Sequence, residues 1–216
     1  GANFTLNSTV TNANNPDMEP QKSTTDEIGT KWDLLNNRLS LTTAVYKTVV
    51  ENETMTELDG STSQNGEKEV EGLEFGAVGE ITDKWNLSAG LAKMNTEYTK
   101  ATSTNEGASL RFSPEHTATL WSTYKFTPAI NVGAGARYVG NQDVKISTTS
   151  TAPVSKIDSS LVYDAMASYK FSKNLSYQLN VYNLTDEEYV ANMNNSGRRY
   201  TPGASRSGLL TLAYKF

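Results

Sequence analysis

Side chains able to carry out acid–base, nucleophilic or metal chemistry are few in this sequence of 216 residues. His116 is the only histidine and cysteine is absent, so neither a histidine-based catalytic triad nor a cluster of histidine and cysteine metal ligands can be assembled. An acidic run, Asp186, Glu187 and Glu188, offers oxygen ligands for a cation, but its place at the start of a polar connection favours a solvated turn. The sequence therefore predicts no catalytic residues, no metal site and no cofactor, in a protein that is not an enzyme.

The overall composition excludes further classes of function. The formal net charge is −5 and no cluster of lysine and arginine is present, so no nucleic-acid partner is expected. No apolar run reaches the roughly 18 residues of a helical membrane span. A membrane-spanning β-strand needs only about 9–11 residues of alternating character, which suits a composition that is 37% apolar.

Apolar and polar residues alternate with a period of two through most of the chain. In the segment 175–182, Tyr177, Leu179 and Val181 fall on one face, while Gln178 and Asn180 fall on the other. This alternation is typical of antiparallel strands with one apolar and one polar face. Nine strands are predicted, at 27–35, 39–51, 69–82, 86–99, 115–126, 130–142, 161–171, 175–184 and 206–216.

The connections between these strands alternate between short and long. Short turns on one side and long polar loops on the other are typical of outer-membrane β-barrels. A soluble antiparallel sandwich would share the alternation within each strand. Short turns are expected at 35–37, 82–85, 127–129 and 172–174, and long connections at about 1–26, 52–68, 100–114, 143–160 and 185–205.

The triplet Tyr-Lys-Phe occurs three times at intervals of 45 residues, and its third copy ends the chain. The first two copies precede short turns, so their aromatic rings are predicted to form a belt at one membrane–water boundary, with the intervening lysines on the opposite face. Cross-strand aromatic pairing in a soluble sheet is the alternative. The predicted belt residues are Trp32, Trp85, Tyr124, Phe126, Tyr169, Phe171, Tyr214 and Phe216.

Several segments resemble TonB-dependent siderophore receptors. NLTDEEY (183–189) and RRYTPGASRSGLLTLAYKF (198–216) are similar to the family's N-L-x-D-x-x-Y motif and to its last strand, which ends in phenylalanine. EVEGLEFGAVGE (69–80) and FSPEHTATLWSTYKF (112–126) resemble two further segments. Ser205 departs from the pattern, because a proline is usual before Arg206. The resemblance runs from about residue 19 to the end of the chain and is nearest to the catecholate-type subgroup.

This resemblance implies an all-β, antiparallel transmembrane β-barrel, in which the chain supplies about nine C-terminal strands of a receptor with about 22 and lacks the plug domain. Residues 1–26 would form an extracellular loop region, and residues 27–216 the C-terminal barrel strands. The implied function is part of an active transporter, in the outer membrane of a Gram-negative bacterium, that imports a ferric siderophore of catecholate type with TonB-coupled energy. The implied partners are the rest of the receptor chain (N-terminal strands and plug), TonB through that missing part, the ferric siderophore, and lipopolysaccharide with outer-membrane lipid. Iron would enter as part of the ligand.

An anionic ferric chelate with aromatic rings would be bound by cations and aromatic faces near the outer mouth of such a barrel. For each candidate, lipopolysaccharide contact, a loop salt bridge or an outer aromatic belt is an alternative role. A passive outer-membrane porin or structural barrel and a soluble β-sandwich binding module are the alternative functions of the whole chain. The ligand-binding candidates are Arg111, Phe112, Arg137, Tyr138, Arg198, Arg199 and Tyr200.

Overall fold

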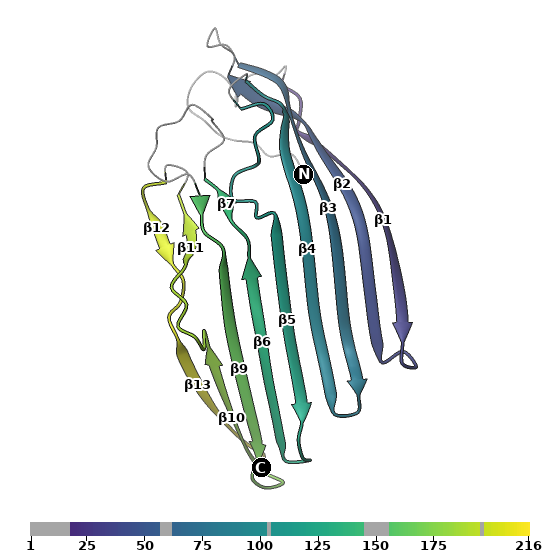
Figure 1. The fold of residues 1–216 in the computed structure, drawn as a ribbon, viewed down its shortest axis with the longest axis vertical. Coiled ribbons are helices and arrows are strands. Elements are labelled where there is room, and N and C mark those ends of the chain that lie inside the picture. The colour runs from purple at the N-terminus through teal and green to yellow at the C-terminus, as the bar shows by residue number, and fades with distance from the viewer. Residues whose placement is uncertain (1–17, 57–61, 103–104, 145–155, 195–196) are drawn as a thin grey trace.

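Nine strands of the computed structural model form one antiparallel sheet, in which each strand pairs with the next one along the chain (Figure 1). The structure describes residues 18–56, 62–102, 105–144, 156–194 and 197–216. Within these ranges no helix is long and apolar enough to cross a membrane. In sheet order the strands are β1 (Lys22–Leu34), β2 (Leu39–Thr56), β3 (Thr62–Thr82), β4 (Trp85–Lys100), β5 (His116–Lys125), β6 (Ile130–Val139), β9 (Ser160–Lys170), β10 (Leu175–Tyr182) and β13 (Ser207–Tyr214).

All nine predicted strands are confirmed, but the prediction of a loop at 52–68 is wrong. β2 continues to Thr56 and β3 begins at Thr62, and the two strands remain paired up to Thr56 and Thr62. Two register shifts, between Val50 and Glu53 and between Glu53 and Met55, absorb the polar residues that suggested a loop. The expected boundary between residues 26 and 27 falls inside β1, and residues 1–17 lie outside the described ranges.

Two small sheets lie within the long connections and were not predicted. β7 (Gln142–Asp143) pairs with β8 (Lys156–Ile157), and β11 (Val190–Met193) pairs with β12 (Tyr200–Pro202). Strands of two to four residues are too short to show an alternating pattern. They add local backbone order to connections that the sequence marks only as polar.

The short turns all lie at one end of the sheet, where the chain also ends (Figure 1). Three of them share one hydrogen-bonding pattern, in which a side-chain hydroxyl accepts hydrogen bonds from the backbone N–H groups two and three residues later. Thr82 accepts from Lys84 and Trp85 at 3.3 and 3.1 Å. The Oγ1 of Thr127 holds the N–H groups of residues 129 and 130, and the Oγ of Ser172 holds those of residues 174 and 175. The turn after β1 instead places Leu35, Asn36 and Asn37 at positive φ.

The sheet has almost no enclosed core. Among the described residues, the buried apolar side chains are those of Ala77, Val144, Ile157 and Val162. Large hydrophobic side chains are instead exposed along the strands, so the backbone ladder and contacts with surroundings outside this chain must stabilise the sheet.

Candidate functional site

One face of the sheet carries a continuous band of exposed apolar side chains. The strand register brings Ile28, Val45 and Leu73 side by side. On the same face, Phe75 pairs with Leu91. Further toward the long connections the same face becomes charged, and Lys47 pairs there with Glu69 and Glu71. A soluble sheet would cover such a band, whereas a barrel wall presents it to lipid. Exposed apolar residues that continue this face along β5 to β13 are Leu120, Ile130, Leu161, Tyr163, Leu179, Leu210 and Leu212.

The aromatic side chains near the short turns form pairs on this outward face. Within each Tyr-Lys-Phe triplet the two rings meet edge to face, with centroids 5.1 Å apart for Tyr124 and Phe126 and 5.2 Å for Tyr214 and Phe216. The Tyr169–Phe171 pair is 6.4 Å apart, and Trp85 donates its indole N–H to Ser122 Oγ at 2.8 Å. The geometry is that of an exposed aromatic row, and its contact with a membrane boundary stays a prediction.

The opposite, inner face combines polar side chains with aromatic rings that lie over glycines. A Cβ at Gly135 would overlap the ring of Trp121, and one at Gly133 would lie 3.0 Å from the Cζ2 of the same ring. The ring of Tyr46 covers Gly72 in the same way. The sequence pattern alone assigned no role to Trp121. A glycine opposite an aromatic on a neighbouring strand was the signal that could have found it.

The candidates Arg137 and Tyr138 lie on opposite faces of β6. Arg137 sits between Thr119 and Val162 on the inner face, and its Nε lies 3.3 Å from Oδ2 of Asp164. Tyr138 pairs with Ala118 and Leu161 on the outward, apolar face. The register therefore leaves only the arginine of this pair on the polar wall.

The last long connection carries Arg198, Arg199 and Tyr200 at the hairpin of β11 and β12. Both arginines are exposed, and their backbone N–H groups donate to Oδ1 of Asn194 at 3.1 Å each. Tyr200 is 64% exposed and lines a cavity of about 660 Å³ together with Tyr189. The acidic residues Asp158, Asp186, Glu187 and Glu188 line the same cavity. Neither arginine lines this cavity, whose walls combine the four carboxylates with Lys156 and with apolar residues such as Val190 and Met193.

Arg111 and Phe112 lie in the connection between β4 and β5. Phe112 has a positive φ of 56° and donates its N–H to the carbonyl of Asp143 at 2.9 Å. Nε of Arg111 is buried and finds no hydrogen-bond partner among the described residues. Burial, and then the carboxylate of Glu53, raise the pKa of Tyr98, although the positive charge of Arg111 acts in the opposite direction.

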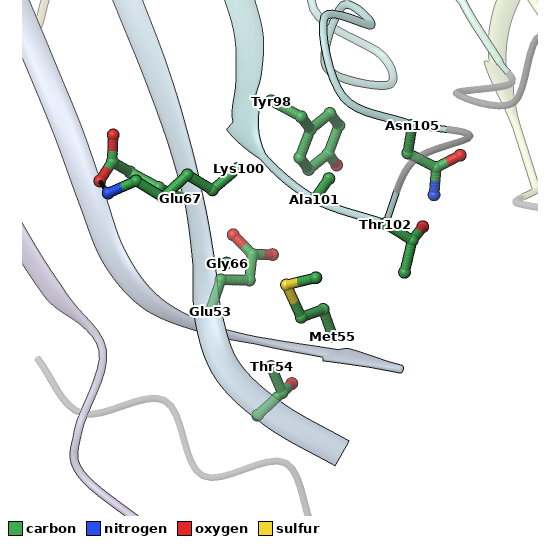
Figure 2. A pocket seen from close by; sticks show the side chains of 10 residues that line it. All are labelled: Glu53, Thr54, Met55, Gly66, Glu67, Tyr98, Lys100, Ala101, Thr102 and Asn105. Carbon is green, nitrogen blue, oxygen red and sulfur yellow. Dashed lines mark hydrogen bonds and ion pairs between the residues drawn. The ribbon is translucent and has the colours of Figure 1, made fainter. Parts of the chain in front are cut away.

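A cavity of about 330 Å³ opens between the upper ends of β2, β3 and β4, beside Tyr98 (Figure 2). Glu67 pairs there with Lys100 at 2.6 Å between Oε2 and Nζ, and Glu53 with Lys68 at 2.7 Å. The hydrogen bonds that Glu67 accepts from Lys100 and from the hydroxyl of Thr99 lower the pKa of its carboxyl group. Because its charges are already paired, this cavity is a poor fit for a multiply charged anion.

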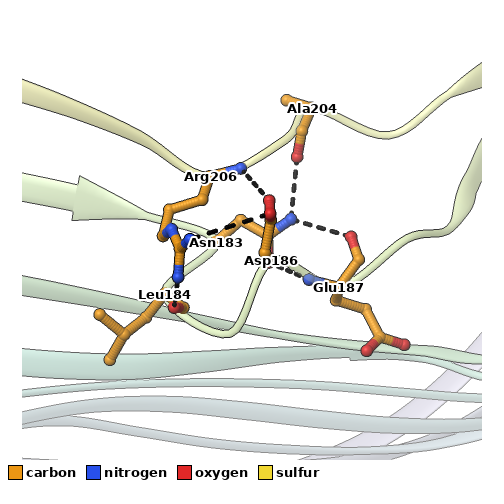
Figure 3. Close-up of polar contacts among 6 residues, drawn as sticks. All are labelled: Asn183, Leu184, Asp186, Glu187, Ala204 and Arg206. Carbon is orange, nitrogen blue, oxygen red and sulfur yellow. Dashed lines mark hydrogen bonds and ion pairs between the residues drawn. The ribbon is translucent and has the colours of Figure 1, made fainter.

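Asn183 closes a polar cluster at the start of the last long connection (Figure 3). It is 3% exposed and has a positive φ of 49°. Its Nδ2 donates to the carbonyls of Glu187 and Ala204, both at 2.9 Å, and its Oδ1 accepts the N–H of Glu187 at 2.8 Å. Oδ1 of Asp186 accepts the N–H of Arg206 at 2.7 Å. The N-L-x-D-x-x-Y motif therefore has a structural role. We call Asn183, Asp186 and the backbone groups that they bind at Glu187, Ala204 and Arg206 the clasp, because they hold the two ends of the connection together.

The acidic run beside this clasp does not gather into a metal site in the described part of the chain. Groups of three or more potential ligands that could hold a metal ion are absent there. The carboxylate of Asp186 accepts the backbone N–H of Arg206, while the side chains of Glu187 and Glu188 are exposed. His116 is also exposed, 3.8 Å from Glu115 between Nε2 and Oε1.

An antiparallel sheet with one apolar face, one polar face, short turns at one end and long connections at the other defines the wall of a membrane-spanning β-barrel. Residues 1–184 match the family described as "TonB dependent receptor-like, beta-barrel", and the chain belongs to this family. Its members in Gram-negative bacteria are outer-membrane proteins, which confirms the predicted localisation.

Individual relatives agree with the predicted subgroup. The chain is 43% identical to the catecholate siderophore receptor Fiu of Escherichia coli strain K12 over 100% of its own length and 29% of that protein. It is 40% identical to the probable TonB-dependent siderophore receptor PiuA of Acinetobacter baumannii, over 97% of the chain and 29% of the relative. The crystal structure of the ferric-catecholate import receptor Fiu in its closed form superposes with a TM-score of 0.88 at 42% identity, over 99% of this chain and 30% of that one. The chain thus spans less than a third of the relatives that it matches.

Proposed function

We propose that this chain forms part of the wall of an outer-membrane active transporter, which binds a ferric siderophore of catecholate type and imports it with TonB-coupled energy. The observation that carries the proposal is the 43% identity to Fiu over the full chain, together with the TM-score of 0.88. The relatives are named as receptors, which favours transport over catalysis.

The inner face and the long connections are the surfaces that such a ligand would meet. A ferric tris-catecholate carries several negative charges and three aromatic rings, so guanidinium groups suit it through charge-assisted hydrogen bonds and stacking. Arg137 supplies one on the inner wall, where its side chain is 55% exposed. Arg198 and Arg199 supply two more on the last connection, next to the exposed ring of Tyr200.

The edge strands of the sheet and its outward face indicate the remaining partners of this chain. β1 and β13 are the edge strands of the described sheet, and unpaired backbone groups at an edge are costly in lipid. The rest of the receptor would pair with these edges and would supply the plug and the contact with TonB. Lipid would cover the apolar band, and lipopolysaccharide would meet the charged strip that contains Lys47 and Glu71.

A binding titration on the full-length receptor in detergent tests this proposal. Ferric tris-catecholate, ferric trihydroxamate and iron-free catecholate would be added while intrinsic tryptophan fluorescence is followed. Saturable quenching by the ferric catecholate, at concentrations at least tenfold below those needed for the other two probes, is the expected result. Equal affinity for the trihydroxamate would overturn the catecholate assignment. Absence of saturable binding for every ferric probe would overturn siderophore binding itself.

A further inference from the structure

Asp164 on β9 contacts two parts of the molecule that belong to different candidate binding surfaces. Its Oδ2 lies 3.3 Å from Nε of Arg137, which stands on the inner wall. Its Oδ1 accepts the backbone N–H of Asn183 at 2.9 Å, where the last long connection begins. The carboxylate is only 17% exposed, so little solvent competes for either oxygen.

Asn183 depends on such external contacts because its backbone conformation is strained. A φ of 49° is unfavourable for a residue other than glycine, although asparagine tolerates it better than most. The hydrogen bonds of its side chain bind Glu187 and Ala204 across the connection, and the bond from its N–H binds it to β9. Loss of the Asp164 acceptor would leave the N–H of a buried residue unpaired, which destabilises the turn.

We infer that Asp164 is a positioning residue that couples Arg137 on the inner wall to the clasp at Asn183, and through it to the connection that carries Arg198, Arg199 and Tyr200. The ion pair with Arg137 restrains the carboxylate that holds the turn. An anion that engages the guanidinium of Arg137 draws it away from Oδ2 and removes that restraint. The inference deepens the proposed function, and rests on it only for the nature of the anion.

Hydrogen exchange at the amide of Asn183, measured on the full-length receptor, tests the coupling without any ligand. The variants are R137M, D164N, D164A and the double variant R137M/D164N. D164N is informative because its amide oxygen still accepts the N–H of Asn183, while the charge that pairs with Arg137 is gone. The matched control is D33N, which removes the carboxylate charge from a different ion pair of the sheet, that of Asp33 with Nζ of Lys31 at 3.7 Å, on β1 and remote in the sheet order from β9.

R137M is expected to speed exchange at Asn183 about three- to tenfold, and D164A to speed it further. In the D164N background the R137M substitution is expected to have no additional effect, because the charged link is already absent. D33N should leave the exchange rate unchanged. Unchanged exchange in R137M, or an equal effect of R137M with and without D164N, would overturn the coupling.

Addition of the ferric tris-catecholate provides the second readout. Exchange at Asn183 should rise on binding in the unmodified receptor and stay constant in D164N. If the probe binds but exchange changes equally in both proteins, the coupling is overturned while the proposed function stands. If no ferric probe binds but the ligand-free cycle shows the predicted non-additivity, the coupling stands and the proposed function fails.

Discussion

The ring of Tyr189 lies over Gly203, and the two residues are joined by a hydrogen bond from the N–H of Gly203 to the carbonyl of Tyr189 at 2.7 Å. A Cβ at position 203 would overlap the ring atoms. The tyrosine of the N-L-x-D-x-x-Y motif and the glycine of the following Pro-Gly segment are therefore two halves of one contact, which closes the connection between β10 and β13.

Replacement of Gly203 by alanine should open this connection. We expect a local destabilisation of about 1–3 kcal/mol, because the ring of Tyr189 must move to admit the methyl group. Hydrogen exchange of residues 189–206 in the full-length receptor would show the loss of protection. Gly208→Ala is the matched control, because its Cβ would meet only the carbonyl oxygen of Asn180, at 3.7 Å. Equal protection in the two variants would contradict the contact.

The assignment of the two faces can be tested with the three tryptophans of the chain. Trp32 and Trp85 lie on the outward face near the short turns, whereas Trp121 covers glycines on the inner face. Brominated lipids quench tryptophans that they touch, so W32F and W85F should each reduce the quenchable fluorescence of the receptor in bilayers. W121F should leave the quenchable part unchanged. A loss of quenching in W121F equal to that in W85F would contradict the inner placement.

The hydroxyl that follows the first Tyr-Lys-Phe triplet should stabilise its turn. Thr127→Val removes the acceptor for the N–H groups of Ala129 and Ile130, bonds of 3.2 and 3.0 Å. We expect a cost of about 1 kcal/mol, seen as faster exchange of these two amides. Thr127→Ser keeps the hydroxyl and should preserve their protection. If serine and valine behave alike, the hydroxyl does not stabilise the turn.

The ion pair of Glu67 and Lys100 predicts a pH dependence at the outer ends of β3 and β4, beyond the apolar band. The pKa of Glu67 in the folded protein is lowered from its usual value of 4.5. The pair therefore contributes stability above pH 4.5, and this contribution is lost as the pH falls through the lowered pKa. Exchange of residues 66–69, corrected for its intrinsic pH dependence, should accelerate below pH 4.5. Glu67→Gln should abolish that acceleration, and its persistence in the variant would assign it to another group.

The strands of this fold could be predicted from the sequence because each carries its own alternating pattern. The pairing of Tyr177 with Tyr169 and Leu212, for example, follows from consecutive strands and their alternation. The extension of β2 and β3 was missed because Glu53 and Gly66 interrupt the alternation at bulges. The short strands β11 and β12 were missed because four and three residues are too few to show an alternating pattern.

The candidate site was less predictable for a related reason. Arg137 and Tyr138 are neighbours in sequence, so a strand sends them to opposite faces, and the register places only Arg137 on the polar inner wall. Asp164 was not among the predicted residues, because its two contacts come from β6 and from the end of β10. A single carboxylate within a strand carries no sequence signal for contacts of that kind.

Uptake of radioactive iron by living cells is the most direct measure of the active import proposed for this receptor. The full-length receptor would be expressed in a Gram-negative strain that lacks its own catecholate receptors, and ⁵⁵Fe would be supplied as a tris-catecholate or as a trihydroxamate. We expect saturable uptake of the catecholate that stops when the proton gradient is dissipated, with little uptake of the trihydroxamate. Uptake of the catecholate that is linear in concentration and unaffected by loss of the gradient would contradict active import and identify a passive pore.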